Sequence, residues 1–271
     1  MKVISREYKL MLRKELFTGD EQQVLRVASA FWHGFTQAIN NIVLDVDGDL
    51  QEIADQRIIK FYDTDENLLH SNHYILRERY EIGKDKKEIT LKFRHPDRYI
   101  SQDRNMNAGE AARGKTKFEE DVKADTKSPF LILYSFSTTQ KISFDKNLIK
   151  LQDAAQLYPD LQDKLIGYTE DKEIKTVGIT AHELVIKGAN FQIRKEPRLD
   201  SECALIVWYD NKGDEKQPVA VEFSFKYGDE NEDYTRKMAH RAYEVFQVLQ
   251  KLTSWVDPES DTKTAYIYRS S

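Results

Sequence analysis

The sequence predicts an α+β protein in which an antiparallel β-sheet is flanked by helices. Several segments alternate apolar and polar residues with a period of about two, which is typical of strands with one buried and one polar face. Two longer segments repeat apolar residues with a period of about 3.6, which is typical of amphipathic helices. The polar faces of the strands combine carboxylates with cations. This pattern fits either an open sheet with one face in water or a closed barrel with a charged interior.

The helical pattern is present in three segments, which are residues 20–42, 153–165 and 231–255. Thr18 or Asp20 is placed to cap the first turn of the first helix, because a short polar side chain there can accept a backbone N–H. Pro159 interrupts or restarts the middle helix, since proline lacks the N–H that the helix needs.

The clearest alternation lies in five segments, which are residues 3–12, 74–81, 88–94, 115–122 and 219–227. Their polar faces repeatedly hold two cations two residues apart, as in Arg77 and Arg79, or a carboxylate followed by a lysine, as in Glu7 and Lys9. Pairs of this kind also form ordinary ion pairs on a solvated sheet, where each contributes roughly 0.2–1 kcal/mol. One strand alone therefore does not distinguish a lumen from an exposed face.

The overall charge argues against a partner that requires a basic surface. The chain has 41 Lys and Arg against 46 Asp and Glu, which gives a net charge of -5. Nucleic acids and anionic membrane surfaces favour basic proteins, so neither is expected as a partner. A local basic pocket remains compatible with this total.

Cysteine content and hydropathy predict a cytoplasmic protein. The single cysteine, Cys203, excludes an internal disulfide and fits a reducing compartment. No apolar run approaches the ~20 residues of a membrane-spanning helix. The first ten residues carry charges where a signal peptide needs an apolar run.

Several motifs, taken in chain order, resemble those of the CYTH superfamily, the triphosphate tunnel metalloenzymes named for class IV adenylate cyclases and thiamine triphosphatases. The first strand of that family reads ExExK, and its later strands include LRxR, TLK, RxExE and a final ExE. The similar segments here are SREYKL (5–10), YDT (62–64), LRER (76–79), ITLKFR (89–94), KFEED (117–121), VEFSF (221–225) and TAYIY (264–268). The last of these resembles a C-terminal tyrosine strand that follows the final helix.

The resemblance implies one domain over residues 1–271, built as an eight-stranded antiparallel β tunnel with a charged lumen and flanking helices. Residues 95–117 are predicted to be a long polar loop within it. The implied activity is hydrolysis of a triphosphate with Mg²⁺ or Mn²⁺. The substrate would be a small molecule: inorganic tripolyphosphate, a nucleoside triphosphate or thiamine triphosphate. The oligomeric state is left open.

The resemblance also implies roles for individual residues. A triphosphate carries about four negative charges, which arginine can bind as a fork and lysine as a point charge. The implied phosphate-binding residues are Lys9, Arg77, Arg79, Lys92, Arg94 and Arg194. The implied catalytic residues are Glu7, Glu119 and Glu222, and the implied metal ligands are Glu7, Glu119, Asp121 and Glu222, because hard divalent cations prefer oxygen ligands. A metal-bound or carboxylate-oriented water would attack the terminal phosphoryl group.

Two positions depart from the family pattern. Ser5 and Ser224 stand where the first and last motifs have a second carboxylate. Their loss lowers the negative charge available to hold a divalent cation. An alternative function is therefore a non-catalytic tunnel that binds a nucleotide or polyphosphate without hydrolysing it.

A third hypothesis is a P-loop nucleotidase. Gly109, Gly114, Lys115 and Thr116 match the pattern GxxxxGK[ST]. That motif requires a buried strand before the loop and a helix after it. The flanking residues are polar and fit neither requirement, so we expect a chance match. The six histidines are scattered and do not predict a zinc site.

Overall fold

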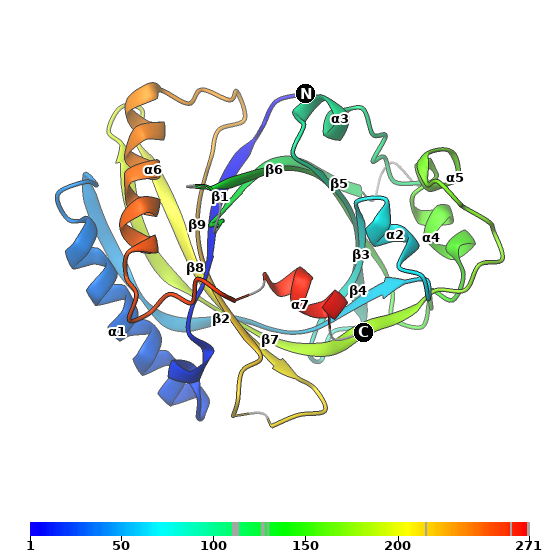
Figure 1. The fold of residues 1–271 in the computed structure, drawn as a ribbon, viewed down its shortest axis with the longest axis horizontal. Coiled ribbons are helices and arrows are strands. Elements are labelled where there is room, and N and C mark those ends of the chain that lie inside the picture. Colours follow the sequence, from blue (N-terminus) through cyan, green and yellow to red (C-terminus); the bar gives the residue numbers. More distant parts are fainter. Residues whose placement is uncertain (110–113, 126–127, 129, 215, 261, 270–271) are drawn as a thin grey trace.

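The protein is built around a β-sheet that closes into a ring (Figure 1). The computed structural model describes residues 1–109, 114–125, 128, 130–214, 216–260 and 262–269. Around the ring the strands follow the order β1-β5-β6-β4-β3-β2-β7-β8-β9. Their bounds are β1 (Ser5–Met11), β2 (Asp45–Asp63), β3 (Tyr74–Glu81), β4 (Lys86–His95), β5 (Gly114–Lys123), β6 (Leu131–Ser143), β7 (Lys175–Arg194), β8 (Leu199–Asp210) and β9 (Ala220–Gly228). The predicted α+β class with a closed sheet is confirmed.

The described strands number nine, where the resemblance implied eight. An odd number of strands cannot close with every neighbour antiparallel, so at least one neighbouring pair must run parallel. That pair is β1 and β5, which align Ser5 with Glu119 and Glu7 with Asp121. The other edge of β1 pairs antiparallel with β9, where Glu7 lies opposite Lys226. The first strand of the chain is thus held between two strands that come much later in the sequence.

Two long helices cover one outer side of the ring (Figure 1). They are α1 (Glu21–Ile39) and α6 (Arg236–Gln250), and the short η1 (Lys14–Phe17) leads into α1. Asp20 caps α1 by accepting a hydrogen bond from the backbone N–H of Gln23, as predicted. The buried face of α1 packs Phe31 and Phe35 onto Phe223 of β9. Burying a phenylalanine side chain contributes roughly 1.5–3 kcal/mol to stability. This core therefore fixes which side chains of the neighbouring strands face outward.

Short helices cover another side of the ring. They are α2 (Leu68–Ser71), α4 (Leu151–Leu157) and α5 (Asp160–Lys164), with α3 (Arg98–Gln102) near the N-terminus. The predicted interruption at Pro159 is confirmed, because α4 ends before it and α5 begins after it. Tyr158, between these two helices, lies with its hydroxyl 2.6 Å from the carbonyl oxygen of Ile89 in β4. The two largest apolar cores therefore lie outside the ring. A smaller apolar cluster, which includes Phe61, Trp208 and Ile267 of the C-terminal segment, lies on the inner side beside the charged residues.

The predicted C-terminal tyrosine strand is wrong, because residues 264–268 belong to the helix α7 (Lys263–Arg269). Each described strand of the ring already has two neighbours, so no sheet edge is open to a further strand. A helix instead satisfies its own backbone groups. It packs against β7 at Gly178, where a side chain would place its Cβ 2.3 Å from the carbonyl oxygen of Ile267.

The segment predicted as a long polar loop is only partly irregular. Within residues 95–117, α3 forms an early turn and β5 begins at Gly114. Lys115 and Thr116 lie inside β5, where Thr116 pairs with Thr138 of β6. A strand therefore stands where a P-loop needs a helix, which rules out the nucleotidase hypothesis. Positions 110–113 of that motif lie outside the described residues. In the part of the chain that the structure describes, no helix combines the length and apolar character needed to cross a membrane.

Candidate functional site

The ring encloses a cavity of about 1280 Å³ lined by the polar parity of the strands and by the C-terminal segment. Among its charged lining residues, twelve are Lys or Arg and nine are Asp or Glu. The lumen is therefore net positive although the chain carries -5. This segregation follows from alternation, because most apolar residues of the strands pack into the outer cores while their charged neighbours face the cavity.

Nine of the ten predicted site residues line this cavity, namely Glu7, Lys9, Arg77, Arg79, Lys92, Arg94, Glu119, Asp121 and Glu222. Arg194 does not. It ends β7 beyond Asn190, the last residue of that strand to reach the cavity. Its guanidinium donates hydrogen bonds to the carbonyl oxygens of Pro197 (2.9 Å) and Asp233 (2.7 Å). Outside the lumen, Arg194 thus connects the segment that leads into β8 with the segment that leads into α6.

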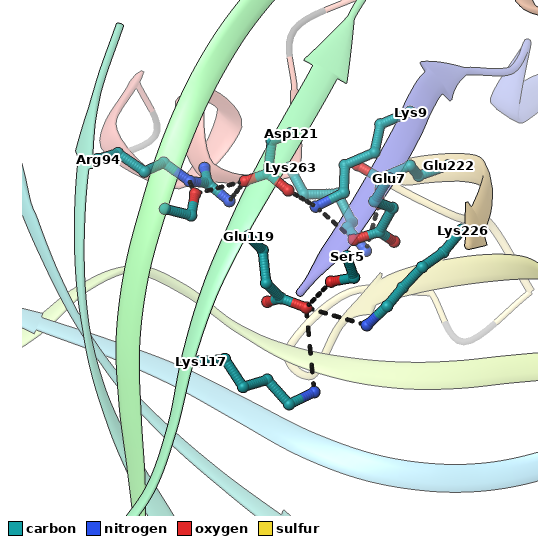
Figure 2. A network of polar contacts seen from close by, with 11 residues as sticks. Ser5, Glu7, Lys9, Arg94, Lys117, Glu119, Asp121, Glu222, Lys226 and Lys263 are labelled. Carbon is teal, nitrogen blue, oxygen red and sulfur yellow. Dashed lines mark hydrogen bonds and ion pairs between the residues drawn. The ribbon is translucent and has the colours of Figure 1, made fainter. Parts of the chain in front are cut away.

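Glu119 of β5 lies at the centre of a dense cluster of donors (Figure 2). Its Oε1 accepts hydrogen bonds from the Ser5 hydroxyl (2.7 Å) and from Lys226 Nζ (2.9 Å), and Lys117 Nζ lies 4.0 Å away. Burial alone would raise the pKa of Glu119, but the ammonium groups of Lys92 and Lys226 bring it to about 2. The carboxylate is therefore ionised and already neutralised. Ser5, where a second carboxylate was expected, acts as a donor to it.

Asp121, two residues further along β5, has its own set of donors. It accepts hydrogen bonds from Lys9 Nζ (2.9 Å) and the Ser135 hydroxyl (2.6 Å), and Arg94 lies 3.2 Å away. These cations hold the pKa of Asp121 well below its usual range against the opposing effect of burial. The same Lys9 ammonium lies 2.9 Å from Glu7, so one lysine bridges two carboxylates of neighbouring strands.

Glu222 of β9 is neutralised by a residue that belongs to none of the strands. Lys263, the first residue of α7, places its Nζ 3.1 Å from Oε1 of Glu222 and 5.2 Å from the centre of the Trp208 ring. Sequence reasoning missed Lys263 because its segment was expected to lead into a strand. With this pair, each of the four carboxylates predicted as site residues, Glu7, Glu119, Asp121 and Glu222, has a lysine partner.

This arrangement does not fit the divalent cation that the resemblance implies. Mg²⁺ and Mn²⁺ need several oxygen ligands that converge on one point. Over the described residues, no group of three or more His, Cys, Asp or Glu side chains is placed to hold a metal ion. The lumen carboxylates instead converge on ammonium groups, and Ser5 and Ser224 supply no negative charge.

Arg77 of β3 and Lys92 of β4 differ from every carboxylate-bound cation of the lumen. They lie on the same face of adjacent strands, displaced by two residues from direct opposition. Neither has a carboxylate within ion-pair distance among the residues that the structure describes, and Nε of Arg77 has no hydrogen-bond partner there. Burial, reinforced by Arg79, lowers the pKa of Arg77 to about 10. Burial, reinforced by Arg94, lowers that of Lys92 to about 8. We call these two residues the unpaired cations.

A second polar group lines the wall beside Arg77 and was also missed by sequence reasoning. Glu183 of β7 accepts a hydrogen bond from Trp208 Nε1 (2.8 Å) and lies 3.5 Å from Arg57 of β2. Register shifts interrupt the pairing of β2 with β7 between Ile53 and Asp55 and between Ile59 and Phe61. Such bulges disturb the period-two pattern, so neither residue stood out as part of a charged face. Arg79 pairs with Glu88 (3.1 Å) on the other side.

The chain is similar in structure to several solved proteins at low sequence identity. A candidate adenylyl cyclase from Hippeastrum, described as having a dominant triphosphatase activity, is 14% identical with a TM-score of 0.48, over 99% of this chain and 96% of that one. A candidate adenylate cyclase from Bacillus halodurans is 14% identical with a TM-score of 0.42, over 97% of both chains. One from Vibrio parahaemolyticus is 11% identical with a TM-score of 0.32, over 98% of both.

No protein-family model matches the chain, and no curated protein does. These three TM-scores all lie below 0.5, so the function of this protein has to follow from the side chains of its own cavity.

Proposed function

We propose that the tunnel binds the phosphate chain of a triphosphate-containing small molecule, such as inorganic tripolyphosphate, a nucleoside triphosphate or thiamine triphosphate. The observation that carries this proposal is the pair of unpaired cations, Arg77 and Lys92, facing one cavity inside the ring. Enclosing a charge without a partner is unfavourable, and an anion bound between the two would offset that cost. Arginine can also bind two phosphate oxygens at once.

The size of the lumen supports a ligand larger than a single phosphate. Pockets for drug-sized ligands commonly measure roughly 300–1,000 Å³, and this cavity of about 1280 Å³ is larger. It can accommodate a phosphate chain together with an organic group. The cations that surround the chain would include Arg79, Arg94 and Lys9, which remain partly available beside their carboxylate partners.

Hydrolysis of the bound triphosphate is a second candidate function, and Glu7 favours it. Glu7 shares its one lysine with Asp121, which leaves it the least neutralised of the four carboxylates predicted as site residues. A carboxylate in that state can orient a water molecule for attack on a terminal phosphoryl group. The surrounding lysines and arginines would stabilise the charge that develops there.

Calorimetric titration of the protein with tripolyphosphate and with ATP tests binding, and phosphate release with and without Mg²⁺ or Mn²⁺ tests turnover. We expect Arg77→Ala to weaken binding about 10- to 100-fold, since one charge-assisted contact contributes roughly 1.5–3 kcal/mol. The control is Arg198→Ala, which removes an exposed arginine outside the cavity. Glu7→Gln should abolish turnover but retain binding if hydrolysis occurs.

Two outcomes would contradict the proposed function. One is the same affinity in Arg77→Ala and Arg198→Ala. The other is loss of binding in Lys115→Ala while Arg77→Ala keeps it, which would place the phosphates at the opening residues of β5.

A further inference from the structure

We infer that the lumen binds its polyphosphate without a divalent cation, because the ammonium groups of Lys9, Lys226 and Lys263 take the places at the carboxylates that a metal ion would need. This inference rests on the proposed function. It departs from the metal dependence that the resemblance implies, and it follows from the positions of these three side chains in the lumen (Figure 2).

The three lysines reach the carboxylates from three different elements. Lys9 comes from β1, Lys226 from β9 and Lys263 from α7. Their Nζ atoms lie 2.9 to 3.1 Å from a carboxylate oxygen. A metal ion at any of these carboxylates would have to displace an ammonium group that already contacts the oxygen. The lysines are thus fixed monovalent cations at the positions where soluble divalent cations would otherwise bind.

The charge of the surrounding wall also disfavours a divalent cation. Lysines and arginines outnumber carboxylates by three among the lining residues, and neighbouring cations hold the pKa of Glu119 and of Asp121 low. A dication entering a net positive cavity meets repulsion, whereas a polyanion meets attraction. Because the cations come with the protein, a polyphosphate needs no accompanying metal to be neutralised.

The two serines at the expected acidic positions act in the same direction. The Ser5 hydroxyl donates to the same Glu119 oxygen that Lys226 contacts, so this oxygen has two donors. Ser224 lies opposite Lys9 across the β1–β9 pair. A carboxylate at either position would add charge for a metal, and a serine adds none. Neither serine therefore supplies the additional negative charge that a metal ion would need beside the remaining carboxylates.

Two independent titrations test the inference on the intact protein. In the first, tripolyphosphate is titrated in EDTA and again with excess Mg²⁺. We expect binding in EDTA at least as tight as binding with Mg²⁺, because Mg²⁺ lowers the charge of the ligand. Binding that requires Mg²⁺ would overturn the inference and leave the proposed function standing. Absence of binding in both conditions would instead overturn the proposed function.

In the second titration, Mn²⁺ alone is added to the unliganded protein and followed by electron paramagnetic resonance. We expect no binding below millimolar Mn²⁺ in the wild type. Lys226→Met should bind Mn²⁺ at least about tenfold more tightly, because it frees Glu119, and Arg198→Ala should behave as the wild type. Micromolar Mn²⁺ binding by the wild type would overturn the inference whether or not tripolyphosphate binds. If Lys226→Met misfolds by circular dichroism, Lys263→Met, which frees Glu222 from the α7 side, replaces it.

Discussion

The two sides of the lumen differ in whether their cations have carboxylate partners. On the side formed by β1, β5 and β9, carboxylates and lysines neutralise one another within 2.9 Å, as at Lys9 and Asp121. On the side formed by β3 and β4, Arg77 and Lys92 face the cavity without a carboxylate partner among the described residues. Both sides follow from the same alternation of strand residues. The first side stabilises the empty protein, and the second leaves charge for a ligand.

The largest expected effect lies on the neutralised side. Asp121→Asn should lower the free energy of unfolding by about 3–5 kcal/mol, because it removes the carboxylate that contacts both Arg94 and Lys9 and leaves Lys9 with Glu7 alone. Urea unfolding at neutral pH measures this. The matched control is Asp200→Asn, which breaks the exposed pair with Arg198 and should cost less than about 1 kcal/mol. If both variants lost the same free energy of unfolding, the buried contacts of Asp121 would stabilise the protein no more than the exposed Asp200–Arg198 pair, which would contradict the prediction.

A smaller effect of opposite sign should appear on the unpaired side. Lys92→Met should raise the free energy of unfolding of the empty protein by about 1–2 kcal/mol at pH 7, since burial makes the lysine charge unfavourable. Lys226→Met, which removes a paired lysine, should lower it by about 1 kcal/mol.

The pH dependence of the free energy of unfolding tests whether the charge of Lys92 destabilises the folded protein. Its pKa is about 8 in the folded protein against 10.5 in the unfolded chain, so the unfolded state binds more protons between these values. Wild-type stability should therefore rise as pH increases from about 8 to 10.5, and this rise should be smaller in Lys92→Met, where Arg77, whose pKa is lowered to about 10, still contributes. A variant that keeps the full rise would assign it to another group.

The smallest effect concerns ligand affinity. Between pH 7 and pH 9, the affinity for tripolyphosphate should fall by up to about tenfold as Lys92 loses its proton near pH 8. Calorimetric titration at constant ionic strength measures the change. Lys92→Arg should flatten the profile, because arginine stays charged throughout this range. An unchanged slope in that variant would exclude Lys92 as the titrating group. The groups that face Lys92 are Arg94, Asp121, Lys9 and Glu119.

Alternation in the sequence was sufficient to place most of the site. The short strands β3 and β4 pair without a register shift and mostly alternate apolar and polar residues, so Arg77 and Lys92 were predicted on the polar parity and do line the cavity. Arg57 and Glu183 were not predicted as cavity residues, because bulges interrupt the long β2–β7 pair and disturb its alternation. Arg194 was misplaced because a strand can extend past the cavity that its earlier residues line.

By itself the sequence determined which side chains are polar, which parity of each strand they occupy and where α1 and α6 lie, because these depend on local spacing. Only the tertiary structure decided which charges meet. Closing nine strands places β1 between β5 and β9, and it leaves no edge for the C-terminal segment, whose helix brings Lys263 to Glu222. Contacts between residues far apart in the sequence depend on how the ring closes, and the local spacing of apolar and polar residues does not determine that closure.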